Sequence, residues 1–210
     1  MDKPELKLSV FSDYICPFSY IGHHRLQQLK NDYDLKINWC LIEIHPETPA
    51  SGMPTTELDY SSEQWQGLVN SLNDLLDDEQ LPFKHEHNFT TNSHQALLLA
   101  EACKPLGADI FYRVHNRLFE AFFVDMINIG DANELKKIAD DCDVPDEITA
   151  QALSSNSKLE EHLKLYLQYA QQAQISGVPS TIIGQKKLTG VSSIQSLKKA
   201  AEESLTDAVS

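Results

Sequence analysis

The N-terminal part of the chain reads as a strand that is followed directly by a helix, with a cysteine at the start of that helix. This pattern limits the folds that the chain can adopt. Residues 6–29 read LKLSVFSDYICPFSYIGHHRLQQL; β-branched and aromatic residues mark 6–11, and a helical pattern runs from about Pro17 to Lys30. A second short apolar segment, LKINWCLIEI, follows at residues 35–44. The order of these three segments predicts a βαβ unit.

Helical patterns dominate the middle of the chain. The proline-rich stretch HPETPASGMP is typical of a long connection. After it, helical apolar spacing appears in SSEQWQGLVNSLNDLL, SHQALLLAEACKPL, ADIFYRVHNRLFEAFF and DANELKKIADDC. In the last of these segments Asp131 and Glu134 have capping-box spacing, which indicates a helix start. We therefore expect a bundle of helices here.

The C-terminal part returns to a mixed pattern. A helix over about Lys158 to Gln174 leads to strands at 181–183 and 187–189, with a turn at Gly184. Ser192 and Gln195 repeat the capping pattern before a last helix, SIQSLKKAAEESL. This part therefore reads as a ββα unit.

The βαβ and ββα units predict one α/β domain that is split by an insertion. We expect residues 1–48 and 172–210 to form this thioredoxin-like domain and residues 49–171 to form an inserted all-helical domain. A helix-only bundle with stray strands is the alternative. The strand patterns at both ends of the chain favour the split α/β domain.

Charge and composition exclude several classes of partner. The 210 residues carry a formal net charge of -14, which would repel phosphate backbones and anionic membrane surfaces. The N-terminal MDKPELKLSVF lacks a signal-peptide pattern, and no run of about 18 apolar residues occurs. We therefore expect a cytoplasmic protein that binds neither nucleic acid nor membranes.

The four cysteines are far apart in the sequence and form no CxxC pair, which favours free thiols over a disulfide framework or a zinc site; they are Cys16, Cys40, Cys103 and Cys142. In KHEHNF, His85 and His87 have no further ligand motif nearby. We therefore predict no metal site and no tightly bound cofactor.

Among these cysteines, Cys16 has the setting of a nucleophile. With Cys16 as the N-cap and Pro17 as the first helical residue, the sulfur would face unpaired N–H groups and the positive end of the helix dipole. This predicts a pKa lowered from about 8.5 to roughly 3.5–7.5. Ser19 would add a hydroxyl and an N–H group. His23 and His24 lie about 10 Å along the helix, too far to deprotonate the thiol directly, and we expect them at the surface.

The segments FSDYICPFSYIG and ISGVPSTIIGQKKLTGVSSIQSLKKA together resemble the DsbA-like branch of the thioredoxin superfamily. The chain looks most similar to FrnE-type oxidoreductases and to their relatives, the 2-hydroxychromene-2-carboxylate isomerases and kappa-class glutathione transferases. TNSHQALLLAEA and LFEAFFVDMINIGDANELKKIADDCDV resemble the inserted helical domain of that family. The resemblance therefore covers nearly the whole chain.

This resemblance implies a binding cleft around Cys16. It places a cis proline, Pro179, opposite the cysteine, and gives the backbone of Val178 the role of pairing with an extended peptide or glutathione. Asn92 matches a position that faces the cleft, although an asparagine before a helix is also a common cap. With these residues, Pro17, Phe18 and Ser192 complete the expected substrate or glutathione site.

The motif CPFS has a serine, Ser19, where a dithiol enzyme has its second cysteine. We therefore expect monothiol exchange, in which glutathione or a protein thiol resolves the mixed disulfide on Cys16. The expected partners are protein or small-molecule thiols and disulfides. Whether the chain forms a homodimer is left undecided by the sequence. A first alternative is a glutathione-dependent isomerase or transferase that acts on an apolar organic substrate. A second is a non-enzymatic thioredoxin-fold adaptor.

Overall fold

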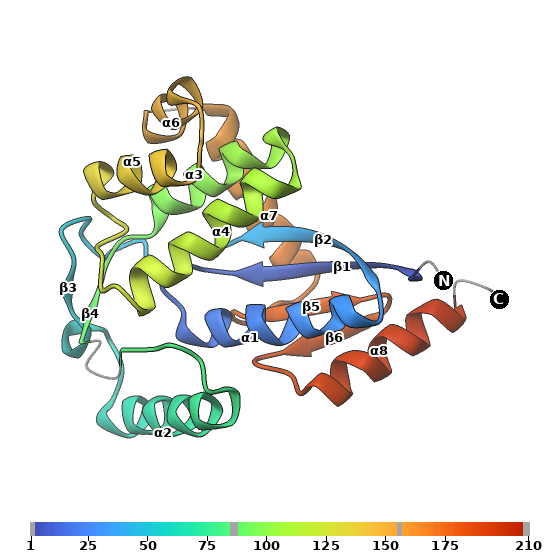
Figure 1. Ribbon diagram of the computed structural model, residues 1–210. Helices are drawn as coiled ribbons and strands as arrows, with labels where there is room; N and C mark the ends of the chain where they lie inside the picture. Colours follow the sequence, from blue (N-terminus) through green and yellow to red (C-terminus); the bar gives the residue numbers. More distant parts are fainter. Residues whose placement is uncertain (1–2, 85–87, 155–156, 208–210) are drawn as a thin grey trace. The chain divides into compact units, whose positions relative to one another are not determined.

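The computed structural model describes residues 3–84, 88–154 and 157–207, and the chain in it forms two compact units (Figure 1). Unit 1 consists of Met1–Ile42 and Tyr166–Ser210, and unit 2 consists of Glu43–Leu165. The predicted α/β fold with a helical insertion is confirmed. The boundaries that we gave for separate domains, after residues 48 and 171, stay a prediction.

Unit 1 is built on a four-stranded sheet in the order β2-β1-β5-β6. The strands are β1 (Glu5–Ser12), β2 (Asp34–Leu41), β5 (Ser180–Ile183) and β6 (Lys186–Thr189). β1 pairs parallel with β2 and antiparallel with β5, and β5 pairs antiparallel with β6. The predicted βαβ unit and the predicted hairpin therefore share one sheet, with β1 in its interior.

Helices cover both faces of this sheet. Successive residues of β1 point to opposite faces. On one face Phe11 packs with Cys40 and with Ala170 of α7 (Ser157–Gln172). The other face is covered by α1 (Pro17–Gln28) and α8 (Ile194–Asp207), which contact each other and run along the sheet in Figure 1. This three-layer arrangement holds the start of α1 at the end of β1.

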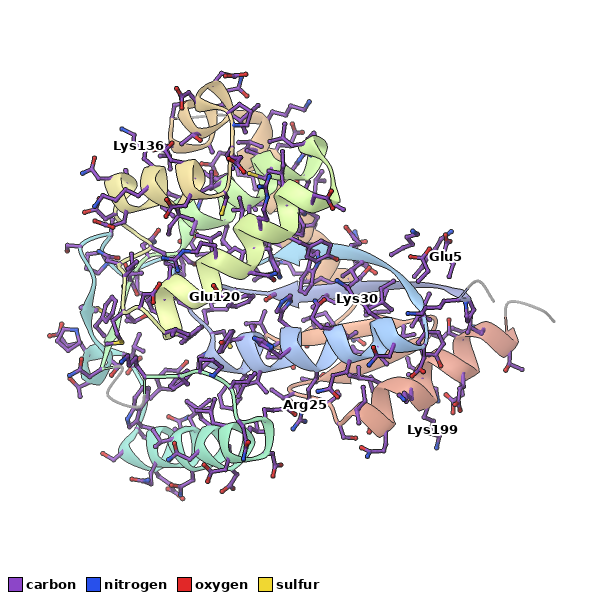
Figure 2. All side chains as sticks on the ribbon, viewed as in Figure 1. Glu5, Arg25, Lys30, Glu120, Lys136 and Lys199 are labelled. Carbon is purple, nitrogen blue, oxygen red and sulfur yellow. The ribbon has the colours of Figure 1, made fainter. Side chains whose placement is uncertain are left out.

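Unit 2 is mostly helical. Its elements are β3 (Met53–Pro54), α2 (Ser62–Glu79), β4 (Phe89–Thr90), α3 (His94–Cys103), α4 (Ala108–Phe123), α5 (Ala132–Asp141), α6 (Asp146–Leu153) and the first part of α7. α3 is buried along nearly its whole length, whereas charged side chains such as Glu120 on α4 and Lys136 on α5, labelled in Figure 2, are exposed. The pairing of β3 with β4 was not predicted, because each strand is only two residues long.

The ends of the helices follow the expected capping chemistry, with one shift. Asp131 caps α5 and accepts a hydrogen bond from the Asn133 N–H group at 2.7 Å. The cap of α8 is Ser193, whose hydroxyl accepts from the Ser196 N–H group at 3.1 Å. The prediction of Ser192 with Gln195 was therefore wrong by one residue, because two adjacent serines offer the same spacing pattern.

Among the described residues, no helix combines the length and the apolar character that crossing a membrane requires.

The turn between β5 and β6 depends on Gly184. Its φ of 56° lies in the left-handed region, which residues with a Cβ atom rarely adopt. A Cβ at this position would also lie 2.7 Å from Ser204 Oγ on α8. The absence of a side chain therefore lets the hairpin turn and lets α8 pack closely against it.

We predict that Gly184→Ala destabilises the protein by about 1–2 kcal/mol, because the left-handed conformation is costly for alanine. The matched control is Gly67→Ala in α2, where a Cβ would meet nothing within 4 Å. This control is expected to stabilise by about 0.5–1 kcal/mol through helix propensity. Urea unfolding midpoints measure both, and a Gly184→Ala midpoint at or above that of the wild type would contradict the prediction.

Candidate active site

Cys16 occupies the predicted position at the mouth of α1. It is the N-cap, with φ −90° and ψ 112°, and Pro17 is the first helical residue. The Cys16 carbonyl accepts the first helical hydrogen bonds, from Ser19 N at 3.0 Å and Tyr20 N at 3.2 Å. Proline fits here because its missing N–H group would have no partner within the helix.

The loop before β5 lies against the thiol. The Cys16 Sγ–H group donates to the Val178 carbonyl oxygen at 3.6 Å, and the Val178–Pro179 peptide bond is cis, as the resemblance implies. Gly22 on α1 permits this approach, since a Cβ there would lie 3.3 Å from Pro179 Cγ. The structure therefore brings Cys16, Val178 and Pro179 together within unit 1.

Burial dominates the acidity of the thiol. Cys16 is 5% exposed, and burial raises its pKa to about 11 because the thiolate would lose its hydration. The Ser19 hydroxyl and N–H group, which could donate to a thiolate, act in the opposite direction on the pKa, and the charge of Asp13 adds to the rise. The predicted lowering of the pKa is therefore wrong for the free protein, because the helix-dipole argument left out desolvation.

Ser19 lies where a second cysteine would lie. The residue is 2% exposed, and its hydroxyl oxygen is buried without a hydrogen-bond partner among the described atoms. Beside a thiolate the same hydroxyl would donate to sulfur, which is how Ser19 lowers the pKa of Cys16. A buried hydroxyl without a partner is costly, so its position favours a role in the chemistry of the sulfur.

The other residues predicted around Cys16 in unit 1 lie close by. Pro17 and Phe18 follow Cys16 directly and are partly exposed. Ser192 lines a small cavity together with Ser19 and Pro179, and its carbonyl accepts a hydrogen bond from Arg25 at 3.3 Å. The structure therefore places these predicted residues in the same part of unit 1 as Cys16, and their roles in binding stay a prediction.

Two buried polar residues, one in the turn before α1 and one on α1, were missed. Asp13 is fully buried in the turn before α1 and accepts a hydrogen bond from the Ile15 N–H group at 3.3 Å. His23 is 5% exposed, so the prediction of a surface residue was wrong. The helical spacing held the signal, because His23 lies four residues after Ser19 and three before Leu26, on one face of α1.

Asn92 belongs to unit 2, where its side chain holds the start of α3. Its amide nitrogen donates to Glu43 Oε1 at 2.8 Å and to the Pro46 carbonyl at 3.3 Å. Its amide oxygen accepts from the His94 N–H group at 3.0 Å. These contacts are those of a capping residue, and a role of Asn92 in binding stays a prediction.

His94 joins the two ends of unit 2. Its imidazole contacts Glu43 Oε2 at 3.0 Å and Glu160 Oε1 at 2.9 Å. The hydrogen bond with Glu43 and, to a lesser extent, the one with Glu160 raise the pKa of His94 to about 9, against the opposing effect of burial. His94 is therefore positively charged at neutral pH and pairs with two carboxylates.

This network predicts a pH-dependent contribution to stability. Because the pKa of His94 is raised from 6.5 to about 9, the contribution is complete below about pH 6.5 and is lost as the pH rises through about 9. We expect His94→Gln to lower the melting temperature near neutral pH and to have little effect at about pH 10. Thermal unfolding of both proteins across this range tests it; a difference that does not change with pH would contradict it.

No cluster of three or more metal-ligating side chains occurs in the part of the chain that the structure describes. His85 and His87 lie outside the described residues, so the reading of this histidine pair stays a prediction.

The sequence matches a known family over most of its length. Residues 7–202 match the DSBA-like thioredoxin domain. The uncharacterized protein YwbO of Bacillus subtilis is 23% identical over 197 residues, which are 93% of this chain and 96% of that protein.

Solved structures with the same fold include oxidoreductases and an isomerase. A probable DsbA oxidoreductase from Streptomyces coelicolor has a TM-score of 0.83 at 16% identity, covering 96% of this chain and 90% of that one. A 2-hydroxychromene-2-carboxylate isomerase has a TM-score of 0.71 at 16% identity, covering 97% and 98%. The cytosolic disulfide reductase DsbM from Pseudomonas aeruginosa, solved with GSH, has a TM-score of 0.66 at 11% identity, covering 97% and 98%.

Proposed function

Because the chain belongs to the DsbA-like thioredoxin family of thiol–disulfide oxidoreductases, we propose that it exchanges thiols and disulfides through one cysteine, Cys16. The observation that carries this proposal is Ser19, which takes the place of a second thiol beside Cys16. The other three cysteines, Cys40, Cys103 and Cys142, are buried. None of the three lies in the CPFS motif, so we propose that an outside thiol resolves the adduct on Cys16.

The reaction then runs in two steps. Sγ of Cys16 attacks one sulfur of a substrate disulfide, the substrate S–S bond breaks, and the second substrate sulfur leaves as a thiol once it has taken up a proton. An outside thiolate next attacks the mixed disulfide and regenerates the Cys16 thiol. The Val178 backbone supports this role, because its carbonyl lies 3.6 Å from the sulfur, where the chain of a bound substrate would pass.

Glutathione is the outside thiol that we propose, in a reducing cytoplasmic compartment. The free state of all four cysteines is compatible with such a compartment. The similar fold of DsbM, a cytosolic disulfide reductase solved with GSH, lends further support. At the start of α8 the Ser193 hydroxyl is engaged with Ser196, which leaves the Ser192 hydroxyl as the serine side chain that we propose to meet a ligand. This predicts weak and transient glutathione binding.

A glutathione-dependent isomerase or transferase is the second candidate. The observation that favours it is the buried and protonated Cys16 thiol, since in that chemistry the residue at the helix mouth orients the sulfur of glutathione and forms no covalent bond. The organic substrate of such a reaction stays open.

Ser19→Cys distinguishes these functions. With a peptide disulfide and no added thiol, the wild type is expected to stop after one turnover as a mixed disulfide on Cys16. Ser19→Cys is expected to release the peptide and to end with an internal disulfide, because it restores a resolving thiol at the motif spacing. Intact-protein mass spectrometry follows both, and reduced glutathione should release the wild-type adduct.

Two outcomes would count against monothiol exchange. Turnover of the wild type without added thiol would mean that Cys40, Cys103 or Cys142 resolves the adduct. A complete lack of adduct on both proteins would favour the isomerase or the adaptor. Cys16→Ser is the control that identifies the modified sulfur.

A further inference from the structure

A small polar cavity lies on the inner side of α1, next to the proposed active site. Its volume is about 10 Å³, which is room for about one water molecule. Polar side chains that line it include Ser19 and His23 of α1, with Thr181 and Ser192 from the opposing segments. Several hydrogen-bonding groups around so small a volume are the surroundings in which an internal water is stable.

Ser19 lies between this cavity and the thiol. Cys16 does not line the cavity, whereas Ser19 lines it and also acts on the Cys16 sulfur through its hydroxyl. That hydroxyl has no hydrogen-bond partner among the described protein atoms. When a bound substrate occupies the Val178 carbonyl, to which the thiol donates in the free protein, the hydroxyl can accept from the thiol while it donates to a water in the cavity, because a hydroxyl has one donor and two acceptor positions.

His23 lies on the same cavity, one helical turn after Ser19. Its ring is 5% exposed and lies 5.6 Å, centroid to centroid, from the ring of Trp39. The amide nitrogen of Gln27, one further turn along α1, lies 3.4 Å from Nδ1 and so helps to fix the ring. The ring nitrogen that can accept a proton is the unprotonated one, which the tautomer determines. A held imidazole at a polar cavity is a suitable proton acceptor.

We propose that Ser19 and a water in this cavity conduct the proton of Cys16 to His23 when the thiol attacks a disulfide. This inference rests on the thiol–disulfide exchange proposed above and explains how a buried, protonated thiol can take part in it. As the new S–S bond forms, the Sγ proton passes to Ser19 Oγ, the Ser19 proton passes to the water, and a water proton passes to the imidazole. The imidazolium then returns a proton to the leaving thiolate, so that protons and charge balance.

Asp13 is the alternative proton acceptor. It is buried, and its charge acts on Cys16. The other titratable groups nearby on α1 are Tyr20, whose ring contacts His24, His24 itself, whose ring contacts His23, and Arg25, which donates to the Ser192 carbonyl. The rest of the lining is neutral: Val10, Gly22, Leu26, Pro179, Thr181, Gly190, Ser192 and Leu197. We favour His23 because the cavity connects it to Ser19.

The test is the rate of mixed-disulfide formation in a single turnover, measured against pH for wild type, His23→Gln and His24→Gln. At about pH 7 His23→Gln should be slower by tenfold or more, since positioned general bases contribute about 10²–10⁴. Its rate should then rise with pH in parallel with thiol ionisation. His24→Gln, the matched control next along α1, should follow the wild-type profile.

A single proton pathway also predicts how two variants combine. Ser19→Ala should slow the attack as well, and the double variant with His23→Gln should be no slower than the slower single variant, because both interrupt one pathway. Circular dichroism and melting temperature confirm folding, and Ser19→Ala gives an independent test if His23→Gln does not fold. Multiplied losses in the double variant would overturn the proposal.

Three further outcomes separate this inference from the proposed function. A His23→Gln profile equal to that of the wild type, together with a slowed Asp13→Asn, would assign the proton to Asp13 and overturn the proposal. If the wild type forms no mixed disulfide, the proposed exchange itself fails. An adduct that forms at the same pH profile in all His23 and Ser19 variants overturns the relay alone and leaves the exchange in place.

Discussion

The contact between the Cys16 thiol and the Val178 carbonyl joins segments that are 162 residues apart in the sequence. The pairing of β1 with β5 places the two segments at one end of the sheet, and Gly22 lets α1 pack onto Pro179. The burial of the thiol and its high pKa both follow from this arrangement. The same carbonyl is the group that an extended substrate would use for pairing, so a bound substrate would compete with the thiol for it.

This competition suits a thiol that is inactive at rest. A buried, protonated cysteine reacts slowly with oxidants and alkylating agents, because the thiolate is the reactive form. The Ser19 hydroxyl and the backbone N–H groups of Phe18 and Ser19 still favour the thiolate, but burial outweighs them in the free protein. Reactivity therefore depends on what removes the proton during the reaction, and not on a permanently ionised sulfur.

The sequence was sufficient for most of the fold because the strand and helix patterns at both ends are strong. The Cys-Pro pair identified the start of α1, and Gly184 identified the hairpin turn. The acidity of Cys16 and the burial of His23 were not predictable in the same way. His23 faces residues of β5 and α8, and the Cys16 thiol contacts the loop before β5. Helical spacing within one segment does not contain that information.

The ion pairs of His94 have a consequence for the evolution of the inserted helical unit. Glu43 lies at the beginning of unit 2 and Glu160 lies near its end, so one imidazole ring brings the two termini of the unit together. A module whose ends meet can be inserted into a host loop without forcing the host strands apart. The helical unit is therefore suited to exchange or diversification during evolution while the sheet and the thiol stay the same.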